Sequence, residues 1–533
     1  ASKRAYNDVL RAASELFHHS DGPHGQWYDA LVHPATTDTP ATTTNDGNDG
    51  KDESRVRRKK LETAEAIELR LLAMLKLRRY SDLGREVDRL RLLDDDDDGG
   101  EGRRHRTPAW VPISLKICAA RSLQYTTGAF LAKSGTTPND DDENDGYDRV
   151  VLPLRHQRCL DALHRLRRDV GATSSATTET IVEGIESRMA AAQVDHALSD
   201  AFVREGDWRM ALLSLERVLD TVDASDAHLA DAFKLDDDDE TKDEDANERR
   251  RRLLDATTAI LRSEVLSRQG RILLQVGALP EAARIFRRAR GETRFAVASG
   301  RRANDDDGAA NESIERRIDE GNDDRHHDDD DDAFDWFDEC PKMSSIIPNF
   351  LYGALGRASV QVLLNEGLLH FARMEYEAAW EKFESAAEYQ RRLEEREEQD
   401  DEEENEEGKK SGREDADDPA VTVTAEAMSF DDVLGCHSTL APPDLTSPAV
   451  PCMNNLSLCK LYGCRLEDAT NVLEDLVLTD PTKYLTETIA FNLCTMYELA
   501  TDTATGERKK RVLQLVAKRF HLHDIAPESF RIA

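Results

Sequence analysis

PCMNNLSLCKLYGCRLEDATNVLEDLVLTDPTKYLTETIAFNLCTMYELA, residues 451–500, indicates the kind of fold that the chain adopts. Its apolar residues recur at a spacing of about 3.6, which predicts helices. The first helix ends in a tight turn at Gly463 and Cys464, a second ends at Asp480 before Pro481, and a third follows. Because one such hairpin cannot bury its apolar faces alone, the stretch predicts further helical hairpins upstream.

The same pattern recurs upstream in a constant phase. Residues 263–290 hold the clearest unit, with small and large apolar residues at Gly270, Leu273, Gly277, Ala282 and Phe286. Residues 359–392 hold another, with Gly367, Tyr376, Ala379 and Phe383. This phase is that of the tetratricopeptide (TPR) repeat, a helical hairpin of about 34 residues. In the C-terminal unit Ala469 takes the small-residue position and Pro481 the closing proline.

These units predict an all-α fold, a TPR-like helical-hairpin solenoid interrupted by disordered acidic loops. We expect divergent N-terminal helical repeats over 1–93, and an acidic linker over 94–107. Further helical repeats follow over 108–222, with an acidic insert at 133–148. The remaining segments are a TPR-like repeat at 250–290, a disordered acidic insert at 291–345, a TPR-like repeat at 346–396, a disordered acidic and proline-containing linker at 397–450, and C-terminal TPR-like repeats at 451–533.

The charge of the chain restricts its partners. Its formal net charge is -36, which opposes direct binding of nucleic acid or of anionic lipid, because a phosphate surface repels it. No apolar run approaches the about 20 residues of a membrane span, so we expect a soluble protein that reaches membranes only indirectly. The 8 cysteines are scattered, which favours free thiols in a reducing compartment. Because the sequence starts at Ala1 without a methionine, we do not expect it to show the true N-terminus.

No residue pattern predicts catalysis, a cofactor or a metal site. Gly353 and Gly356 lack the lysine and the strand of a phosphate-binding loop. Zinc ligation is one interpretation of Cys452, Cys459, Cys464 and His437, but the spacing lacks a C-x-x-C pair and small core residues are favoured. His326 and His327 lie among aspartates, where an unordered loop is favoured over a cation site.

Three features offer surfaces for partners. Asn454, Asn455 and Asn492 could line a concave groove and bind a peptide backbone, although the basic and amide residues of a carboxylate clamp are not recognisable. An aromatic group near Pro341 is either a docking motif or an anchor for its own insert; it comprises Phe334, Trp336 and Phe337. The basic runs 55–60 and 249–252 are interpreted as solvated helix faces.

Residues outside the repeat positions carry a family resemblance. It rests on WVPISLKICAA at 110–120, LQY at 123–125, CLDALHRLR at 159–167, NN at 454–455, LY at 461–462, DPTKYLTE at 480–487, FNLCTMYEL at 491–499, KK at 509–510, SF at 529–530 and IA at 532–533. In order and phase these residues resemble the TPR-containing subunit-twelve family of the trafficking protein particle (TRAPP) complex. The acidic inserts depart from that family, and its long N-terminal region is not found ahead of these repeats.

The resemblance implies a non-catalytic scaffold subunit of a TRAPP-type vesicle tethering complex, which acts as exchange factor for a Rab GTPase in ER-to-Golgi transport and autophagy. The implied partners are other TRAPP subunits, with the Rab GTPase reached through the complex. The implied location is cytoplasmic, peripherally at ER–Golgi intermediate or Golgi membranes, and a mitotic role is secondary. Two alternatives stay open: a TPR peptide-binding co-chaperone or adaptor, and an enzyme whose site combines residues distant in sequence.

Overall fold

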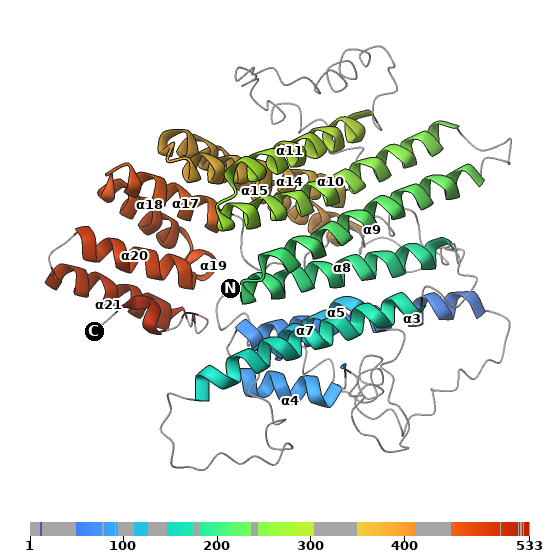
Figure 1. The fold of residues 1–533 in the computed structure, drawn as a ribbon, viewed down its shortest axis with the longest axis horizontal. Helices are drawn as coiled ribbons and strands as arrows, with labels where there is room; N and C mark the ends of the chain where they lie inside the picture. Colours follow the sequence, from blue (N-terminus) through green and yellow to red (C-terminus); the bar gives the residue numbers. More distant parts are fainter. Residues whose placement is uncertain are drawn as a thin grey trace.

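Helices and the turns between them make up the computed structural model, which describes residues 11–12, 49–76, 79–90, 92–93, 111–125, 147–173, 181–235, 244–302, 349–411, 449–500, 503–520, 522, 525 and 527–531. Within these ranges no strand occurs. The helices pack in pairs, and each pair lies against the next in chain order (Figure 1). The predicted all-α, TPR-like array is therefore confirmed.

Each pair consists of a first and a second helix. In chain order the pairs are α3 (Asp49–Lys76) with α4 (Tyr80–Leu90), α5 (Ile113–Ser122) with α7 (Tyr147–Thr173), α8 (Ile181–Glu205) with α9 (Trp208–Leu235), α10 (Glu244–Val276) with α11 (Leu279–Arg302), α14 (Asn349–Ala372) with α15 (Tyr376–Ser411), α17 (Ala449–Tyr462) with α18 (Leu466–Thr479), and α20 (Glu487–Ala500) with α21 (Thr503–Arg519). A single turn, α19 (Pro481–Tyr484), precedes α20, and the short helix η4 (Pro527–Phe530) follows α21.

The turns inside four of the pairs share one backbone geometry. A residue with positive φ ends the first helix, and it is Gly206 (80°), Gly277 (86°), Met374 (66°) or Cys464 (60°). The next amide in each turn donates to a carbonyl five residues earlier, as in Arg465 N to Lys460 O at 2.8 Å. This hydrogen bond closes a helix C-terminus of the Schellman type. The four turns therefore place the second helices at the same point of each repeat.

Small residues lie where the two helices of a pair approach each other. Ala282, Ala379 and Ala469 are fully buried, each on a second helix. A Cβ added to Gly270 would lie 2.2 Å from Cε1 of Phe286, and one added to Gly367 would lie 2.5 Å from Cε1 of Phe383. In these two pairs a phenylalanine ring therefore occupies the space that a first-helix side chain would need.

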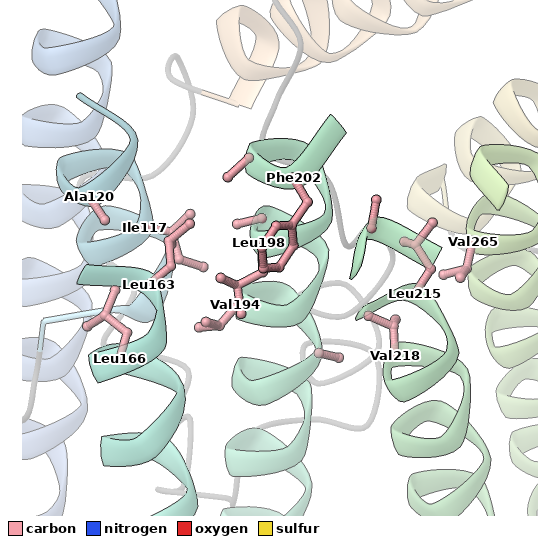
Figure 2. Packing of buried hydrophobic residues seen from close by; sticks show 14 of the residues in the cluster. Ile117, Ala120, Leu163, Leu166, Val194, Leu198, Phe202, Leu215, Val218 and Val265 are labelled. Carbon is pink, nitrogen blue, oxygen red and sulfur yellow. The ribbon is translucent and has the colours of Figure 1, made fainter. Parts of the chain in front are cut away.

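The buried apolar residues form a core that continues from pair to pair. Figure 2 shows the part built from α5, α7, α8, α9 and α10, where Phe202 and Leu198 lie between Leu163 on one side and Leu215 on the other. A second part joins α10, α11, α14, α15 and α17, and a third joins α17, α18, α20 and α21. Because each cluster draws on consecutive pairs, no pair buries its apolar surface alone.

Several helices extend beyond the segment boundaries that the sequence predicts. α11 continues to Arg302 inside the predicted insert 291–345, and α15 continues to Ser411 inside the predicted linker 397–450. α7 starts at Tyr147, α9 ends at Leu235 and α10 starts at Glu244, each beyond its predicted limit. Glu, Arg, Lys and Ala favour helix, so a helix fixed by packing continues into charged sequence. On α15, ion pairs such as Arg391–Glu388 (2.7 Å) lie just before this extension.

Other predicted segments lie outside the described residues. These are the linker 94–107, most of the insert 133–148, the aromatic group at Phe334, Trp336 and Phe337, and the histidines His326, His327 and His437. Among the described helices, none combines the length and apolarity that crossing a bilayer requires.

Candidate functional site

Polar side chains connect the first helices of successive pairs and form one face of the array, which we name the first-helix face. Arg121 of α5 lies 3.5 Å from Asp200 of α8, and Asp200 also pairs with Arg268 of α10. Further along the chain, hydrogen bonds from Arg271 to Gln361 (3.3 Å) and between Ser267 and Asn365 (2.7 Å) join α10 to α14. A hydrogen bond between Asn454 and Asn492 (2.6 Å) joins α17 to α20. Solenoids use such extended faces to bind partners.

The asparagines predicted to line a groove lie on this face, but they bond to one another. Asn492 donates from Nδ2 to Oδ1 of Asn454 at 2.6 Å, and Nδ2 of Asn454 lies 3.5 Å from Oδ1 of Asn455. All three side chains are half-buried. The amide groups of Asn454 and Asn492 therefore join α17 to α20. In this structure they bind each other, whereas the sequence offered them as contacts for a peptide.

The remaining predicted repeat residues are placed as follows. Leu273 is half-buried on α10, and Gly277 is exposed in the turn that follows. Tyr376 begins α15 and stacks on Tyr462 with ring centroids 5.5 Å apart. Pro481 starts α19, where Asp480 caps the turn by accepting hydrogen bonds from the amides of Thr482 (2.8 Å) and Lys483 (3.3 Å).

The cysteines for which zinc was one interpretation are separated in the structure. Cys452 and Cys459 are buried in the apolar core between α15 and α17, whereas Cys464 is exposed in its turn. Burial raises the pKa of the Cys452 thiol to about 12 and that of Cys459 to about 11. Both thiols are therefore protonated at neutral pH and act as small apolar groups. Within the described ranges, His, Cys, Asp and Glu form no group of three or more that could hold a metal ion.

Four arginines gather where α5, α8 and α10 meet on the first-helix face, and we name them the arginine cluster: Arg121, Arg204, Arg268 and Arg271. The side chains of Arg121 and Arg268 are 23% and 29% exposed, and Asp200 between them is 13% exposed. One carboxylate therefore serves two guanidinium groups. Among the residues that the structure describes, no ion pair joins Arg204 or Arg271 to a carboxylate.

Arg204 holds its place through uncharged groups. Its guanidinium donates to Oε1 of Gln124 and, at 2.9 Å, to the hydroxyl of Tyr125. The ring of Tyr125 stacks on Tyr80 with centroids 5.7 Å apart. These contacts orient Arg204 at the edge of the arginine cluster while its charge stays uncompensated.

The arginine cluster holds like charges close together. Burial, together with the charges of Arg271 and Arg121, lowers the pKa of Arg268 to about 9. Burial and the charge of Arg204 likewise lower the pKa of Arg121. His196, on α8 beside them, is buried with neither ring nitrogen hydrogen-bonded, and burial together with Arg268 lowers its pKa well below the usual value. His196 is therefore uncharged, and the arginines supply the local field.

The arginine cluster is not predicted by any pattern in the sequence, because its members come from three helices that are far apart in the chain. A weak signal was present: Asp200 and Arg271 each lie six residues before a turn glycine, Gly206 and Gly277. Equal distances from the turn place side chains on the same face of successive first helices. When charged residues are aligned on the turns, Asp200 and Arg271 therefore take equivalent positions, one turn of helix from the Arg268 with which Asp200 pairs.

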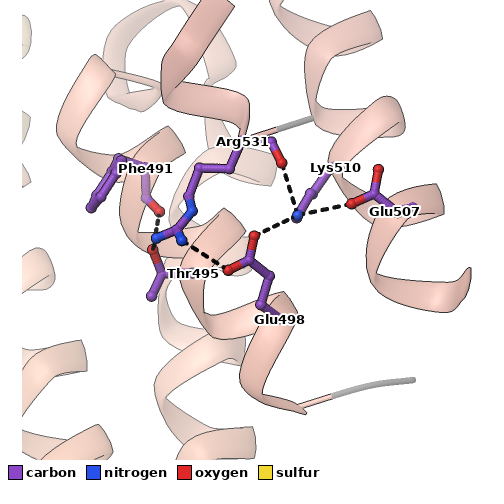
Figure 3. A network of polar contacts seen from close by, with 6 residues as sticks. All are labelled: Phe491, Thr495, Glu498, Glu507, Lys510 and Arg531. Atoms are coloured by element: carbon purple, nitrogen blue, oxygen red, sulfur yellow. Dashed lines mark hydrogen bonds and ion pairs between the residues drawn. The ribbon is translucent and has the colours of Figure 1, made fainter. Parts of the chain in front are cut away.

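A second polar cluster closes the C-terminal end of the array (Figure 3). Lys510 of α21 is buried, and its Nζ contacts Glu498 (2.6 Å), Glu507 (2.9 Å) and the carbonyl of Arg531 (3.0 Å). Arg531 in turn pairs with Glu498 at 3.1 Å and lies over the ring of Phe491. These contacts fasten η4 and the residue after it to α20 and α21.

The outer surface of α21 has no helix packed on it among the described residues. Val512 and Leu515 are 53% and 63% exposed there. Exposed basic residues surround them: Arg508, Arg511, Lys518 and Arg519. We name these six residues the α21 outer surface. Val512 and Leu515 thus form a small exposed apolar area that basic residues border.

The phase of the small residues, the shared turn geometry and the continuous core define a helical-repeat protein of the TPR class. No protein-family model matches the chain. Part of the chain is similar to trafficking protein particle complex subunit 12 of mouse, 41% identical over 66 residues, which is 12% of this chain and 8% of that protein. The human protein of the same name is 42% identical over 64 residues, 12% of this chain and 9% of that one. The chain thus matches less than a tenth of the length of these curated relatives.

Two solved structures align over most of this chain. The TPR domain of P58(IPK) is 9% identical with a TM-score of 0.18, over 99% of this chain and 95% of that one. The Cut9-Hcn1 hetero-tetramer of the APC/C is 10% identical with a TM-score of 0.18, over 99% of this chain and 93% of the matched one.

Proposed function

We propose that the protein is a non-catalytic scaffold subunit of a TRAPP-type vesicle tethering complex. The observation that carries the proposal is the identity of 41% over 66 residues with subunit 12 of that complex. The repeat array supports it, because an array of helical hairpins offers a long surface on which several proteins can assemble. The role is structural, and the exchange activity on a Rab GTPase belongs to the complex.

The α21 outer surface is the proposed contact with a neighbouring subunit. Leu515 and Val512 supply apolar area at the end of the array, and the arginines and lysines around them favour an acidic surface on the partner. This basic surface stands out on a chain of net charge -36. The partner is therefore a TRAPP subunit whose docking surface combines apolar residues with acidic ones.

The proposed location of the protein in the cell follows from its membership of this complex. We infer a cytoplasmic protein that lies peripherally at ER–Golgi intermediate or Golgi membranes and acts in ER-to-Golgi transport and autophagy. Its contact with membranes is indirect, through the complex, because the chain as a whole repels anionic lipid.

Affinity purification of the full chain from cells, followed by mass spectrometry, tests the proposal. We expect several subunits of the TRAPP complex to co-purify at comparable abundance. Co-purification of molecular chaperones in their place would favour the co-chaperone alternative and contradict the scaffold role.

A further inference from the structure

Four exposed arginines and an exposed phenylalanine follow one side of α11. Their spacing of three, four and seven residues places them on one face of the helix. We name this group the α11 stripe: Arg284, Arg287, Arg288, Arg294 and Phe295. A Cβ added to Gly291, which lies on the same face, would meet nothing within 4 Å. In Figure 1, α11 runs along the upper border of the helices with α10 and α14 below it, so the stripe is not covered by a described helix.

The charge of the α11 stripe departs from the pattern of the other repeats. Arg287 lies ten residues after the turn residue Gly277, and the tenth residue after each of the other three turn residues of this geometry is a glutamate. These glutamates are Glu216 of α9, Glu384 of α15 and Glu474 of α18. Equal distances from the turn place all four side chains on the same face of their helices. Among these four second helices, α11 alone has a basic residue there.

Acidic side chains compensate little of the charge of the α11 stripe. Among the residues that the structure describes, no hydrogen bond or ion pair joins Arg284, Arg287 or Arg288 to a carboxylate. Glu292 lies in the field of Arg288 but also in that of Arg262. A row of like charges on one helix face is mutually repulsive. The α11 stripe therefore favours an acidic ligand.

The chain itself supplies an acidic segment beside α11. Residues 303–348, which we name the α11–α14 segment, contain 17 acidic and 4 basic residues. The segment starts directly after α11 and ends directly before α14, and α14 packs against both α10 and α11. It includes the aspartates at 328–332, which the aromatic group Phe334, Trp336 and Phe337 follows. Its charge is thus complementary to the stripe, and both of its ends adjoin the helices that carry or support the stripe.

The α11–α14 segment is long enough to reach the whole stripe. From Arg284 to Phe295 the stripe covers eleven helical residues, about 17 Å. An unfolded chain of 46 residues, the length of this segment, spans about 35–40 Å on average. In the segment the aspartates precede the aromatic group, as the first three arginines of the stripe precede Phe295. One direction of the chain therefore brings charge to charge and aromatic to aromatic.

We propose that the α11 stripe binds the α11–α14 segment of the same chain. The aspartates at 328–332 pair with Arg284, Arg287 and Arg288, and the aromatic group packs on Phe295. Arginine suits this role because its planar fork binds a carboxylate through two parallel hydrogen bonds. Aromatic side chains stabilise each other beyond the area that they bury. Because the segment is joined to α11, its high effective concentration at the stripe favours it over a separate acidic protein.

Attachment also selects between the two basic surfaces of the chain. The α21 outer surface belongs to the last pair of the array, whereas both ends of the α11–α14 segment adjoin α11 or a helix packed on it. The proposal assigns the aromatic group as an anchor for its own insert, one of the two interpretations that the sequence left open. This contact does not depend on membership of a TRAPP-type complex.

Photo-crosslinking in the full chain tests the inference. The probe is p-benzoylphenylalanine at the position of Phe295, and the matched control has the same residue at the position of Leu213 on α9, because these two side chains are 40% and 41% exposed. A mixture of isotope-labelled and unlabelled chains distinguishes cross-links within a molecule from those between molecules. Mass spectrometry should place most cross-links from position 295 in residues 328–337 of the same molecule, and at least about tenfold fewer from position 213.

Variants relate the contact to its charges. With the probe at position 295, Arg287→Glu should lower the yield of these cross-links about tenfold, because it places like charge against the aspartates. Arg209→Glu, the same change at an exposed arginine of α9, should leave the yield unchanged. Both variants should keep the melting temperature of the parent chain, since both side chains are exposed, and this separates a lost contact from a lost fold.

A change outside the helices provides a second measure of the same contact. Replacing aspartate by asparagine throughout 328–332 should lower the yield from position 295 as Arg287→Glu does, because it removes the proposed partners of the arginines. Equal yields from Arg287→Glu and Arg209→Glu would overturn the proposal. Cross-links confined to residues 236–243, to a second copy of the chain or to another protein would also overturn it, because the α11 stripe would then have a different ligand.

Discussion

The ring of Phe286 fills the space beside Gly270, so that a methyl group on Gly270 would lie 2.2 Å from ring atom Cε1. Gly270→Ala should therefore destabilise the protein by about 1–3 kcal/mol, because the helices or the buried ring must move. Gly291→Ala on α11 is the matched control, since its Cβ would meet nothing within 4 Å. It should stabilise by about 0.5–1 kcal/mol through helix propensity. Urea unfolding measures both, and equal effects would contradict the proposed packing.

At two of the turns, replacing a residue by glycine should stabilise the protein. Met374 and Cys464 have φ values of 66° and 60°, where two other repeats have Gly206 and Gly277. Met374→Gly and Cys464→Gly should each stabilise the protein by about 1 kcal/mol, since a side chain in the left-handed region is strained. Gly277→Ala should destabilise it by a similar amount. Thermal unfolding of the three variants tests the assignment, and stabilisation by Gly277→Ala would refute it.

Asp480 gives a pH-dependent contribution to stability. Although burial works to raise its pKa, hydrogen bonds from Thr482 and the amide of Lys483 hold the pKa of Asp480 below its usual value of 3.8. A carboxyl whose pKa is lowered on folding stabilises above its unfolded pKa and loses that contribution as pH falls through the folded one. The α19 cap should therefore weaken only below about pH 4.

Substitutions at Asp480 separate the charge from the cap. Asp480→Ala should cost about 1 kcal/mol at neutral pH, because two amide donors of α19 lose their acceptor. Asp480→Asn keeps an oxygen acceptor and should remove most of the acid dependence. Urea unfolding at pH 7 and below pH 4 measures both effects. Unchanged acid sensitivity of Asp480→Asn would assign that sensitivity to other groups.

Lys510 is predicted to hold the C-terminal end of the array together. Lys510→Met keeps the length of the side chain but removes the contacts with Glu498, Glu507 and the carbonyl of Arg531. It should destabilise the protein by about 1–2 kcal/mol, a modest value because both carboxylates are partly exposed. The amide of Arg531, bonded to Glu528 at 3.0 Å, should exchange with solvent faster in the variant. Unchanged exchange would show that η4 is held by its apolar contacts.

The hairpins and their phase could be predicted from the sequence because apolar periodicity and small residues are local signals. Ala282, Ala379 and Ala469 could be aligned from the sequence, and each is fully buried in the structure. The helix ends were harder to predict. α15 continues to Ser411 because acidic and basic residues are good helix formers, although runs of like charge are also typical of disorder.

The polar features could be recognised only in the structure. Cys464 and the turn were predicted, but the left-handed conformation of a cysteine has no sequence signature of the kind that glycine supplies. Asn454 and Asn492 were interpreted as possible contacts with a peptide, and the structure shows them bonded to each other. The arginine cluster depends on which faces of α5, α8 and α10 meet, so no local sequence pattern contains it.

The proposed docking of the α21 outer surface can be tested in the full chain. Leu515→Glu places a carboxylate in the centre of that surface, and Leu213→Glu on α9 is the control at another exposed leucine, 41% exposed. Both variants should fold with an unchanged melting temperature, because neither side chain belongs to the core. Only Leu515→Glu should lose its partner subunit.

Whether the protein joins a TRAPP complex through the α21 outer surface can be measured by quantitative mass spectrometry of the proteins that co-purify with the wild-type chain, with Leu515→Glu and with Leu213→Glu. We expect TRAPP subunits with the wild-type chain and with Leu213→Glu, and at least about tenfold fewer of them with Leu515→Glu. Absence of TRAPP subunits from the wild-type purification would rule out the proposed scaffold role.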